Sequence, residues 1–376
     1  MPQAVPKFAL HCFACELAHD PRVLQRVCTA CGQPLRVDYD LGSIRLARAD
    51  LRDRPTSLWR YREVLPLRVD HAVSLDEGFT PLLKVTDFVW VKDESRNPTG
   101  SFKARGMTAA VSMARYLGAK ALSAPSAGNA AGALAAYGAR AGLPVTVAMP
   151  TDTPASFFAE CELYGATVHR VAGTIGDAGK FLRELALRDT FDMSTLWEPY
   201  RIEGKKTMAY ELVEQLNGAV PDVIIYPTGG GTGLIGMRKA FDEMATLGWI
   251  ARGRRPRFVS VQAEGCAPIV KAFHAGSERT EPWPNATTLA YGLRVPAPLG
   301  GALCLRALRE TNGTAIAIGE AELARAAREL AARSGLDICP EGGAAWAALT
   351  RLRDSGWIGE HETSVVFNTG TGLKYR

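Results

Sequence analysis

Short apolar runs separated by turn residues and helical stretches recur along most of this chain. Each run is about as long as a buried strand and is followed by residues that favour a turn and then a helix. Strands that alternate with helices of this size predict parallel sheets covered on both faces. We therefore expect an α/β protein with two lobes of doubly wound parallel sheet. The runs lie at 119–124, 144–149, 166–171, 222–226, 257–261, 314–318 and 364–367.

One turn in this pattern carries a single lysine, Lys103. Residues 97–106 read N-P-T-G-S-F-K-A-R-G, a short strand is expected at 89–94, and residues 104–118 suit a helix. The positive end of a helix disfavours a second positive charge, so Lys103 should lose its proton more easily than a solvated lysine. A neutral amine attacks carbonyl carbons. On the local sequence alone, however, an ordinary surface lysine is the favoured interpretation.

Composition and charge narrow the class of protein. The chain has 376 residues, of which 47% are hydrophobic, and a formal net charge of +5 without a basic block. Small anionic ligands are therefore expected rather than nucleic acid. The N-terminus lacks the apolar core of a signal peptide, and Arg140 interrupts the apolar stretch 123–149, so we expect a cytoplasmic protein outside the membrane. We expect three parts: an N-terminal segment of residues 1–45, a large α/β domain formed by 46–110 together with 200–376, and a small α/β domain of 111–199.

Four of the eight cysteines form two C-x-x-C pairs near the N-terminus, with twelve residues between the pairs. Two such pairs can direct four thiolates at one tetrahedral zinc ion, and Gly32 suits the tight turn of a knuckle. A disulfide pair or a redox site is the weaker alternative in a cytoplasmic chain. The segment lacks the basic stripe of a nucleic-acid reader, so we expect a structural zinc ribbon. The predicted ligands are Cys12, Cys15, Cys28 and Cys31.

Two glycine-bearing loops follow predicted strands. Residues 125–132 read P-S-A-G-N-A-A-G, and their small side chains leave backbone N–H groups accessible at a helix start, which favours an anion such as a carboxylate. Asn129 adds a side-chain donor. Residues 227–233 read P-T-G-G-G-T-G. Their glycines let successive N–H groups converge on one phosphate, with Thr232 as a hydroxyl donor.

The second loop also contains a competing motif. Gly231, Gly233 and Gly236 satisfy G-x-G-x-x-G, which occurs in nicotinamide-dependent dehydrogenases. A dinucleotide site would need an acidic residue at the end of the next strand, and Glu264 comes somewhat late for that role. A dehydrogenase also leaves Lys103 without a function.

The last apolar run is followed by a turn that contains Thr369. This residue is placed to offer a neutral hydroxyl to a ring nitrogen, although a capping threonine explains the local sequence equally well. An activated amine, a phosphate loop, a carboxylate loop and a hydroxyl are together what pyridoxal 5′-phosphate requires of a protein.

From about Gly78 to the C-terminus these motifs resemble those of pyridoxal-phosphate enzymes with the tryptophan synthase β fold, or fold type II. N-P-T-G-S-F-K-A-R-G is similar to the segment with the family's cofactor-bearing lysine, P-S-A-G-N-A-A to its asparagine loop, and P-T-G-G-G-T-G to its cofactor-phosphate loop. The resemblance implies that Lys103 bears the cofactor, Asn129 contacts the ring hydroxyl and Thr369 faces the pyridine nitrogen. The implied cofactor-binding residues are Phe102, Lys103, Asn129, Gly229, Gly230, Gly231, Thr232, Gly233 and Thr369.

Within that family the chain resembles the threonine synthases. Residues 198–211 are similar to their R-x-E-G-x-K-T segment, and dehydratases of the fold tend to have glycine where Lys206 stands. The implied reaction converts O-phospho-L-homoserine and water to L-threonine and phosphate, a carbon–oxygen lyase reaction of threonine biosynthesis. Lys205, Lys206 and Thr207 begin a helix and could receive the substrate phosphate, or could be exposed. The expected substrate-binding residues are Ser126, Ala127, Gly128, Asn129, Ala130, Lys206 and Thr207.

Two departures from the threonine synthase pattern keep other reactions open. Ala104 stands where many threonine synthases have aspartate, and Gly230 where some have asparagine. The alternatives are elimination from threonine or serine, and β-replacement on O-phosphoserine as in cysteate synthase. A zinc-ribbon interaction protein with an inactive catalytic body is a further alternative class. The family resemblance also implies a homodimer.

Overall fold

The computed structural model describes residues 7–185, 187 and 189–376, which form two compact units. Unit 1 holds the described residues up to Phe79 together with Lys103–Met208, and unit 2 holds Thr80–Phe102 with Ala209–Arg376. The three-part domain division expected from the sequence stays a prediction. None of the helices in the described part of the chain combines the length and apolar character needed to span a bilayer.

Unit 1 begins with a small antiparallel sheet in the order β2-β1-β3, which we call the ribbon. Gly32 closes its second cysteine turn with φ 68°, and its N–H donates to the Cys28 carbonyl oxygen at 2.9 Å. This positive φ explains why glycine follows the second C-x-x-C pair. The ribbon consists of β1 (Phe8–Cys12), β2 (Ala18–His19) and β3 (Leu35–Tyr39).

The proline-punctuated segment after the ribbon folds into short 3-10 helices. Trp59 and Tyr61 are buried, and the Trp59 indole N–H donates to Glu77 Oε1 at 3.0 Å and to Thr108 Oγ1 at 3.2 Å. The segment therefore packs on the body of unit 1. Its helices are η1 (Leu41–Ser43), η2 (Arg48–Leu51), η3 (Leu58–Val64) and η4 (Val69–His71).

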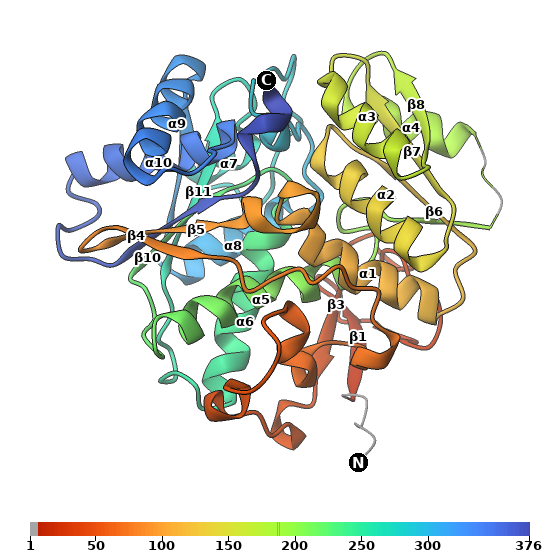
Figure 1. Ribbon diagram of the computed structural model, residues 1–376, viewed down its shortest axis with the longest axis horizontal. Coiled ribbons are helices and arrows are strands. Elements are labelled where there is room, and N and C mark those ends of the chain that lie inside the picture. The colour runs from red at the N-terminus through yellow and green to blue at the C-terminus, as the bar shows by residue number, and fades with distance from the viewer. Residues whose placement is uncertain (1–6, 186, 188) are drawn as a thin grey trace. The chain divides into compact units, whose positions relative to one another are not determined.

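The rest of unit 1 is an α/β layer with a four-stranded parallel sheet in the order β8-β7-β6-β9. Helices α1 and α2 pack against each other, and α3 and α4 pack on the sheet strands (Figure 1). The boundary between the units falls within α5. The elements are α1 (Lys103–Tyr116), β6 (Ala121–Pro125), α2 (Asn129–Ala141), β7 (Val145–Pro150), α3 (Ala155–Leu163), β8 (Thr167–Val171), α4 (Ile175–Glu184), β9 (Thr190–Asp192) and α5 (Tyr200–Gln215).

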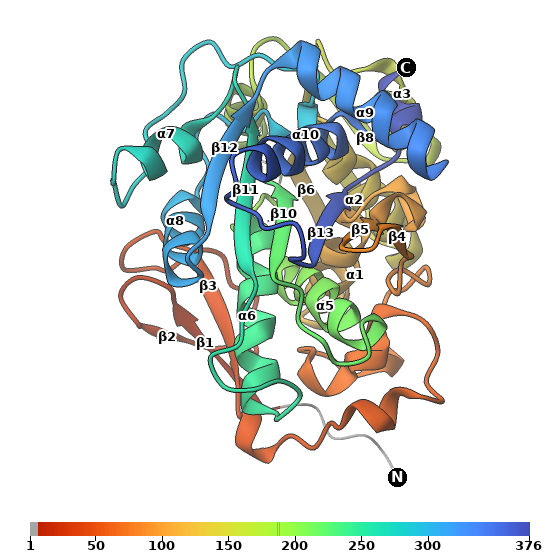
Figure 2. The same cartoon turned by 90° about the vertical axis from the view of Figure 1, so that its left-hand side faces the viewer.

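Unit 2 contains a six-stranded sheet in the order β12-β11-β10-β13-β5-β4, whose strands lie side by side in Figure 2. Only β4 runs antiparallel to its neighbour. The elements are β4 (Leu82–Thr86), β5 (Val89–Asp93), η5 (Glu94–Arg96), η6 (Pro98–Gly100), β10 (Val223–Pro227), α6 (Thr232–Thr246), β11 (Arg257–Ala263), α7 (Pro268–His274), η7 (Tyr291–Leu293), α8 (Gly301–Glu310), β12 (Thr314–Ile318), α9 (Glu320–Ser334), α10 (Pro340–Asp354), β13 (Ser364–Asn368) and η8 (Gly372–Tyr375).

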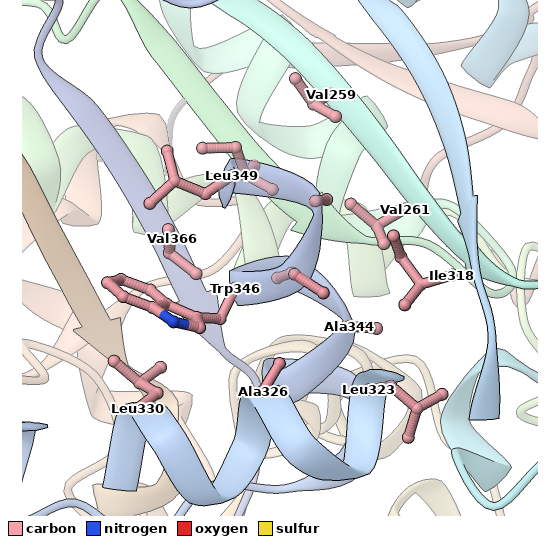
Figure 3. Close-up of a cluster of buried hydrophobic side chains, with 14 of the residues drawn as sticks. Val259, Val261, Ile318, Leu323, Ala326, Leu330, Ala344, Trp346, Leu349 and Val366 are labelled. Atoms are coloured by element: carbon pink, nitrogen blue, oxygen red, sulfur yellow. The ribbon is translucent and has the colours of Figure 1, made fainter. Parts of the chain in front are cut away.

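The core of unit 2 forms where α9 and α10 cover this sheet. Trp346 of α10 points toward Leu330 of α9 and Val366 of β13, while Val261 and Ile318 come from neighbouring strands (Figure 3). These strands are apolar on both faces because helices cover the sheet, which is why their sequences read as continuous apolar runs. The strands hold the loops at their carboxyl ends in fixed positions, and those loops carry most of the predicted site residues.

Candidate active site

Four cysteine thiols gather in the ribbon. The Sγ atoms of Cys12, Cys15, Cys28 and Cys31 all lie within 4.8 Å of one another. Cys12 and Cys31 are 3.4 Å apart at sulfur, and Cys15 and Cys28 are 3.6 Å apart. Four thiolates around tetrahedral zinc lie about 3.8 Å from one another, given Zn–S bonds of about 2.3 Å. The predicted ligand set therefore fits a zinc ion in both chemistry and spacing.

Lys103 is the first residue of α1, where the turn sequence predicts a helix start. Gly106, one turn later, lies against α5: a Cβ atom built there would be 2.9 Å from Lys205 Cε and 3.2 Å from the Arg201 carbonyl oxygen. Lys205 is only 1% exposed. Burial lowers the pKa of its amine well below the ordinary value, and the charges of Lys103 and Arg201 lower it further. The first turn of α1 therefore lies beside a buried amine on α5.

Glycine lets α5 approach the backbone of α1 closely. A Cβ atom on Gly204 would lie 1.7 Å from the carbonyl oxygen of Arg105. The Arg105 guanidinium donates from Nη1 to Thr207 Oγ1 at 3.1 Å, and the Thr207 hydroxyl donates to the Gly204 carbonyl oxygen at 2.6 Å. Both side chains are fully buried. These contacts fix the second turn of α5 against the first turn of α1.

Lys206 has its partners inside unit 1. Its Nζ lies 2.7 Å from Glu203 Oε2 and 4.2 Å from the centroid of the Tyr39 ring, and the side chain is 0% exposed. The Tyr39 hydroxyl donates to the same Glu203 oxygen at 2.8 Å. No local pattern predicts this cluster, because Tyr39 lies 164 residues before Glu203 in the chain. The substrate-binding role expected for Lys206 and Thr207 stays a prediction.

Asn129 is the first residue of α2 and follows β6 after a short loop. Gly128 before it adopts φ 140°, which disfavours any side chain there. Ser126 Oγ accepts hydrogen bonds from the N–H groups of Gly128 and Ala131, both at 3.1 Å, and thus shapes the loop. Because β6 pairs in parallel with β9, this loop lies at the same sheet edge as the segment that enters α5. The substrate-binding role of residues 126–130 stays a prediction.

Glu198 caps the start of α5 and is a residue to which the sequence assigned no role. Its Oε2 accepts hydrogen bonds from the N–H groups of Tyr200 at 2.7 Å and Arg201 at 3.1 Å. Burial raises the pKa of the Glu198 carboxyl to about 7, although Arg201, these two N–H groups and Lys205 favour the ionised form. Arg201 is itself buried and donates from Nη1 to the Met193 carbonyl oxygen at 2.9 Å.

The raised pKa of Glu198 predicts a loss of stability between pH 5 and pH 8. Between its ordinary pKa of 4.5 and about 7 the folded state binds more protons than the unfolded state, so stability falls as pH rises. The change in unfolding free energy is about 3 kcal/mol. Glu198→Gln keeps an acceptor for the two N–H groups but does not titrate. Between pH 5 and pH 8 the melting temperature of the wild type should fall by a few degrees relative to that of the variant. A difference between the two melting temperatures that is the same at every pH would contradict the raised pKa of Glu198.

The glycine loop of unit 2 connects β10 to α6, with Gly231 at the N-cap in a left-handed conformation of φ 83°. Side chains do not fit at three of its glycines, because an added Cβ atom would clash. The nearest atoms are Gly292 O at 2.3 Å for Gly229, Cys304 Sγ at 2.2 Å for Gly231 and Tyr226 OH at 2.0 Å for Gly233. The first N–H groups of α6 have no partner within the helix. A loop bordered by backbone N–H groups at a helix start fits a phosphate group.

Three neighbouring parallel strands of unit 2, β5, β13 and β10, bring further predicted residues to the same sheet edge. Thr369 follows β13 directly, and its carbonyl oxygen accepts a hydrogen bond from the Phe102 N–H at 3.1 Å. The Phe102 ring meets the Tyr226 ring edge to face, with centroids 6.0 Å apart. Cys339, which the sequence did not single out, places Sγ 3.8 Å from Thr369 Oγ1. Phe102, Thr369 and the glycine loop thus lie together in unit 2.

Groups that can bind pyridoxal phosphate occur in both units. Unit 2 contains the glycine cradle for a phosphate and the hydroxyl of Thr369, which is 5% exposed. Unit 1 contains the amine of Lys103 and the side chain of Asn129, each at the first residue of a helix. These protein groups fit the chemistry of the cofactor. An amine can bond to the cofactor's aldehyde, and backbone N–H groups can bind its phosphate.

Comparison with known proteins agrees with this fit. Residues 73–370 match the family described as pyridoxal-phosphate dependent enzymes. The chain is 35% identical to a threonine synthase of Methanosarcina acetivorans, over 98% of this chain and 92% of that protein. A threonine synthase of Methanocaldococcus jannaschii is 34% identical, over 96% of this chain and 92% of its own length.

The fold also matches solved structures. A pyridoxal 5′-phosphate-dependent aspartate racemase aligns with a TM-score of 0.67 and 23% identity, covering 78% of this chain and 90% of that one. At this level of identity the likeness shows the fold alone, and it confirms the fold type II architecture predicted from the sequence. The family match also places the chain among pyridoxal-phosphate enzymes rather than nicotinamide-dependent dehydrogenases.

Proposed function

Because this chain belongs to the family of pyridoxal-phosphate-dependent enzymes, we propose that it acts as a threonine synthase. It converts O-phospho-L-homoserine and water to L-threonine and phosphate. The single observation that carries the proposal is the similarity to threonine synthases along nearly the whole chain, ribbon included. A lyase or dehydratase of the same fold would share the cofactor motifs, which lie after residue 73. The similarity to the threonine synthase also includes the N-terminal segment that forms the ribbon.

The cofactor is pyridoxal phosphate, which when bound supplies an electron sink for charge that develops next to the substrate nitrogen. The protein's own residues hold and orient it. Lys103 would form the covalent link, and the loop from Gly229 to Gly233 would bind the phosphate. Asn129 would contact the ring hydroxyl, Phe102 would lie beside the ring and Thr369 would face the ring nitrogen. These assignments rest on the motifs and are supported by the positions of the residues at helix starts and strand ends.

Lys103 moves the protons of the reaction. With cofactor and substrate bound, its ε-amine would take the proton from Cα and then one from Cβ as phosphate leaves Cγ. It would return protons to Cγ and Cα as water adds at Cβ. One amine can serve several carbon atoms only if it is held within hydrogen-bond reach of each in turn. The contacts between α1 and α5 restrict the turn that carries Lys103. Arg201, a buried cation of α5, suits attraction of the substrate phosphate.

A comparison of three substrates tests the assignment against its nearest rivals. Values of kcat/KM are measured for O-phospho-L-homoserine, L-threonine and O-phospho-L-serine with sulfite. We expect O-phospho-L-homoserine to be preferred by at least about a hundredfold, since its phosphate supplies charge-assisted hydrogen bonds. Preference for L-threonine, with 2-oxobutyrate as product, would assign the chain to the dehydratases. Preference for O-phospho-L-serine would assign it to the β-replacement enzymes.

We place the enzyme in the cytoplasm and expect it to form a homodimer. All eight cysteines are free thiols in the structure, and thiols persist in a reducing compartment. The dimer follows from the family resemblance, and light scattering of the purified protein measures it directly.

A further inference from the structure

Tyr39, at the end of β3, joins the ribbon to the N-terminal part of α5. The Tyr39 hydroxyl donates to Glu203 Oε2 at 2.8 Å, and its ring lies 4.2 Å from the ammonium of Lys206. Glu203 and Lys206 are themselves an ion pair at 2.7 Å, and both are at most 1% exposed. Tyr39 therefore contacts both members of a buried ion pair, once through its hydroxyl and once through its ring. Hydrogen bonds to buried charged groups and desolvated cation–π contacts are among the stronger polar interactions.

The position of Tyr39 depends on the cysteine cluster. Strand β1 ends at Cys12 and pairs with β3 in a register that sets Cys12 opposite Leu35 and Phe8 opposite Tyr39. The Phe8 ring lies 6.0 Å from the Tyr39 ring and 6.4 Å from the ring of Tyr200 at the start of α5. A ribbon of three short strands has little core of its own and gains stability from a staple. A metal ion bound by the four cysteines would keep β1 and β3 paired and so keep Tyr39 in place.

The same turn of α5 supports the turn that carries Lys103. Gly204 and Thr207, next to Glu203 and Lys206 in sequence, contact Arg105 of α1 through the close backbone approach and the buried hydrogen bond described above. Arg105 is two residues after Lys103. A continuous series of contacts within unit 1 therefore runs from the ribbon to the catalytic lysine.

We propose that Tyr39 is a positioning residue for Lys103, because the metal-bound ribbon uses it to hold the Glu203–Lys206 pair and so keeps α5 docked on α1. The ribbon is thus part of the catalytic apparatus rather than an independent binding module. The kinetic part of this inference rests on the proposed function, since it needs a substrate that the enzyme turns over.

Two substitutions at Tyr39 test the proposal by kinetics. Tyr39→Phe removes the hydrogen bond to Glu203 but keeps the ring, and Tyr39→Leu removes both contacts. We expect kcat per bound cofactor to fall about tenfold in the first variant and about a hundredfold in the second, with KM within about twofold of wild type. Normalising to bound cofactor excludes misfolded protein from the comparison. Tyr164→Phe, a change at a partly exposed tyrosine of the same unit, serves as the control and should keep the wild-type kcat.

A double-mutant cycle separates this role from a general loss of stability. Cys12→Ser weakens the metal site and should lower kcat about as much as Tyr39→Leu does. The double variant should be little worse than either single variant, because both changes act through the same contact. If the two losses multiply instead, or if both Tyr39 variants keep the wild-type kcat, the proposal is wrong.

A measurement without substrate keeps the proposal independent of the assigned reaction. The dissociation constant of pyridoxal phosphate is measured on the apoenzyme of each variant. We expect it to rise about tenfold in Tyr39→Leu and in Cys12→Ser and to stay unchanged in Tyr164→Phe, since a displaced Lys103 forms its link less favourably. If wild type fails to turn over O-phospho-L-homoserine but this pattern holds, the proposed function fails and the role of Tyr39 stands. Equal dissociation constants in all four proteins would overturn the role of Tyr39.

Discussion

Replacing Lys103 by alanine is expected to remove the visible absorbance band of the lysine-bound cofactor and to lower kcat at least about a thousandfold. The change deletes both the amine that holds pyridoxal phosphate and the base that moves the substrate protons, and each of these contributions alone is large. Borohydride reduction followed by mass measurement should add the mass of the cofactor to the wild type and not to the variant. The absorbance spectrum and the reduced mass together check the assignment.

Lys120→Ala is the matched control, because Lys120 is an exposed lysine shortly after the same helix. This variant should keep the absorbance band, the borohydride adduct and the wild-type kcat. The assignment of Lys103 fails if Lys103→Ala still binds the cofactor covalently.

Adding one methyl group at Gly204 is expected to cost about 1 to 3 kcal/mol of stability and about a hundredfold in kcat. The new Cβ atom would lie 1.7 Å from the carbonyl oxygen of Arg105, a backbone atom that cannot rotate away. Helix α5 must therefore move off α1, and the turn that carries Lys103 loses its support. Thermal unfolding and kcat per bound cofactor measure the two effects separately.

Gly176→Ala in α4 is the control for the added methyl group. A Cβ atom there has an ordinary contact at 3.4 Å from Thr174 Oγ1, and the residue is exposed. Its stability should be equal to or slightly above that of wild type, because alanine restricts the unfolded chain. If Gly204→Ala behaves like this control, close docking of α5 on α1 does not matter for catalysis.

The fold could be predicted from the sequence because its strands are covered on both faces. Each of the seven apolar runs that predicted a strand coincides with a strand of the structure, and the helix expected at 104–118 is α1, Lys103–Tyr116. Strand β9, Thr190–Asp192, was missed because it has three residues and carries no periodic signal. Its place beside β6 follows from pairing across the sheet, which the local sequence does not encode.

Part of the candidate site could likewise be predicted from the sequence, and part could not. Glycines at strand ends identified both loops, since only glycine tolerates the close contacts found at Gly229 and Gly231. The partners of Lys206 could not be predicted, because Tyr39 comes from a distant segment and burial of a lysine depends on tertiary packing. For the same reason the local sequence left open whether this basic pair is exposed, whereas Lys205 and Lys206 are both buried.

The central claim is that this enzyme makes threonine from a phosphorylated four-carbon amino acid. The most direct test incubates the purified holoenzyme with O-phospho-L-homoserine in water enriched in the heavy isotope of oxygen and quantifies every product. Phosphate and L-threonine should form in equal amounts, with the heavy oxygen in the threonine hydroxyl group. Phosphate release without threonine, or no reaction by an enzyme that carries its full complement of cofactor, would contradict it.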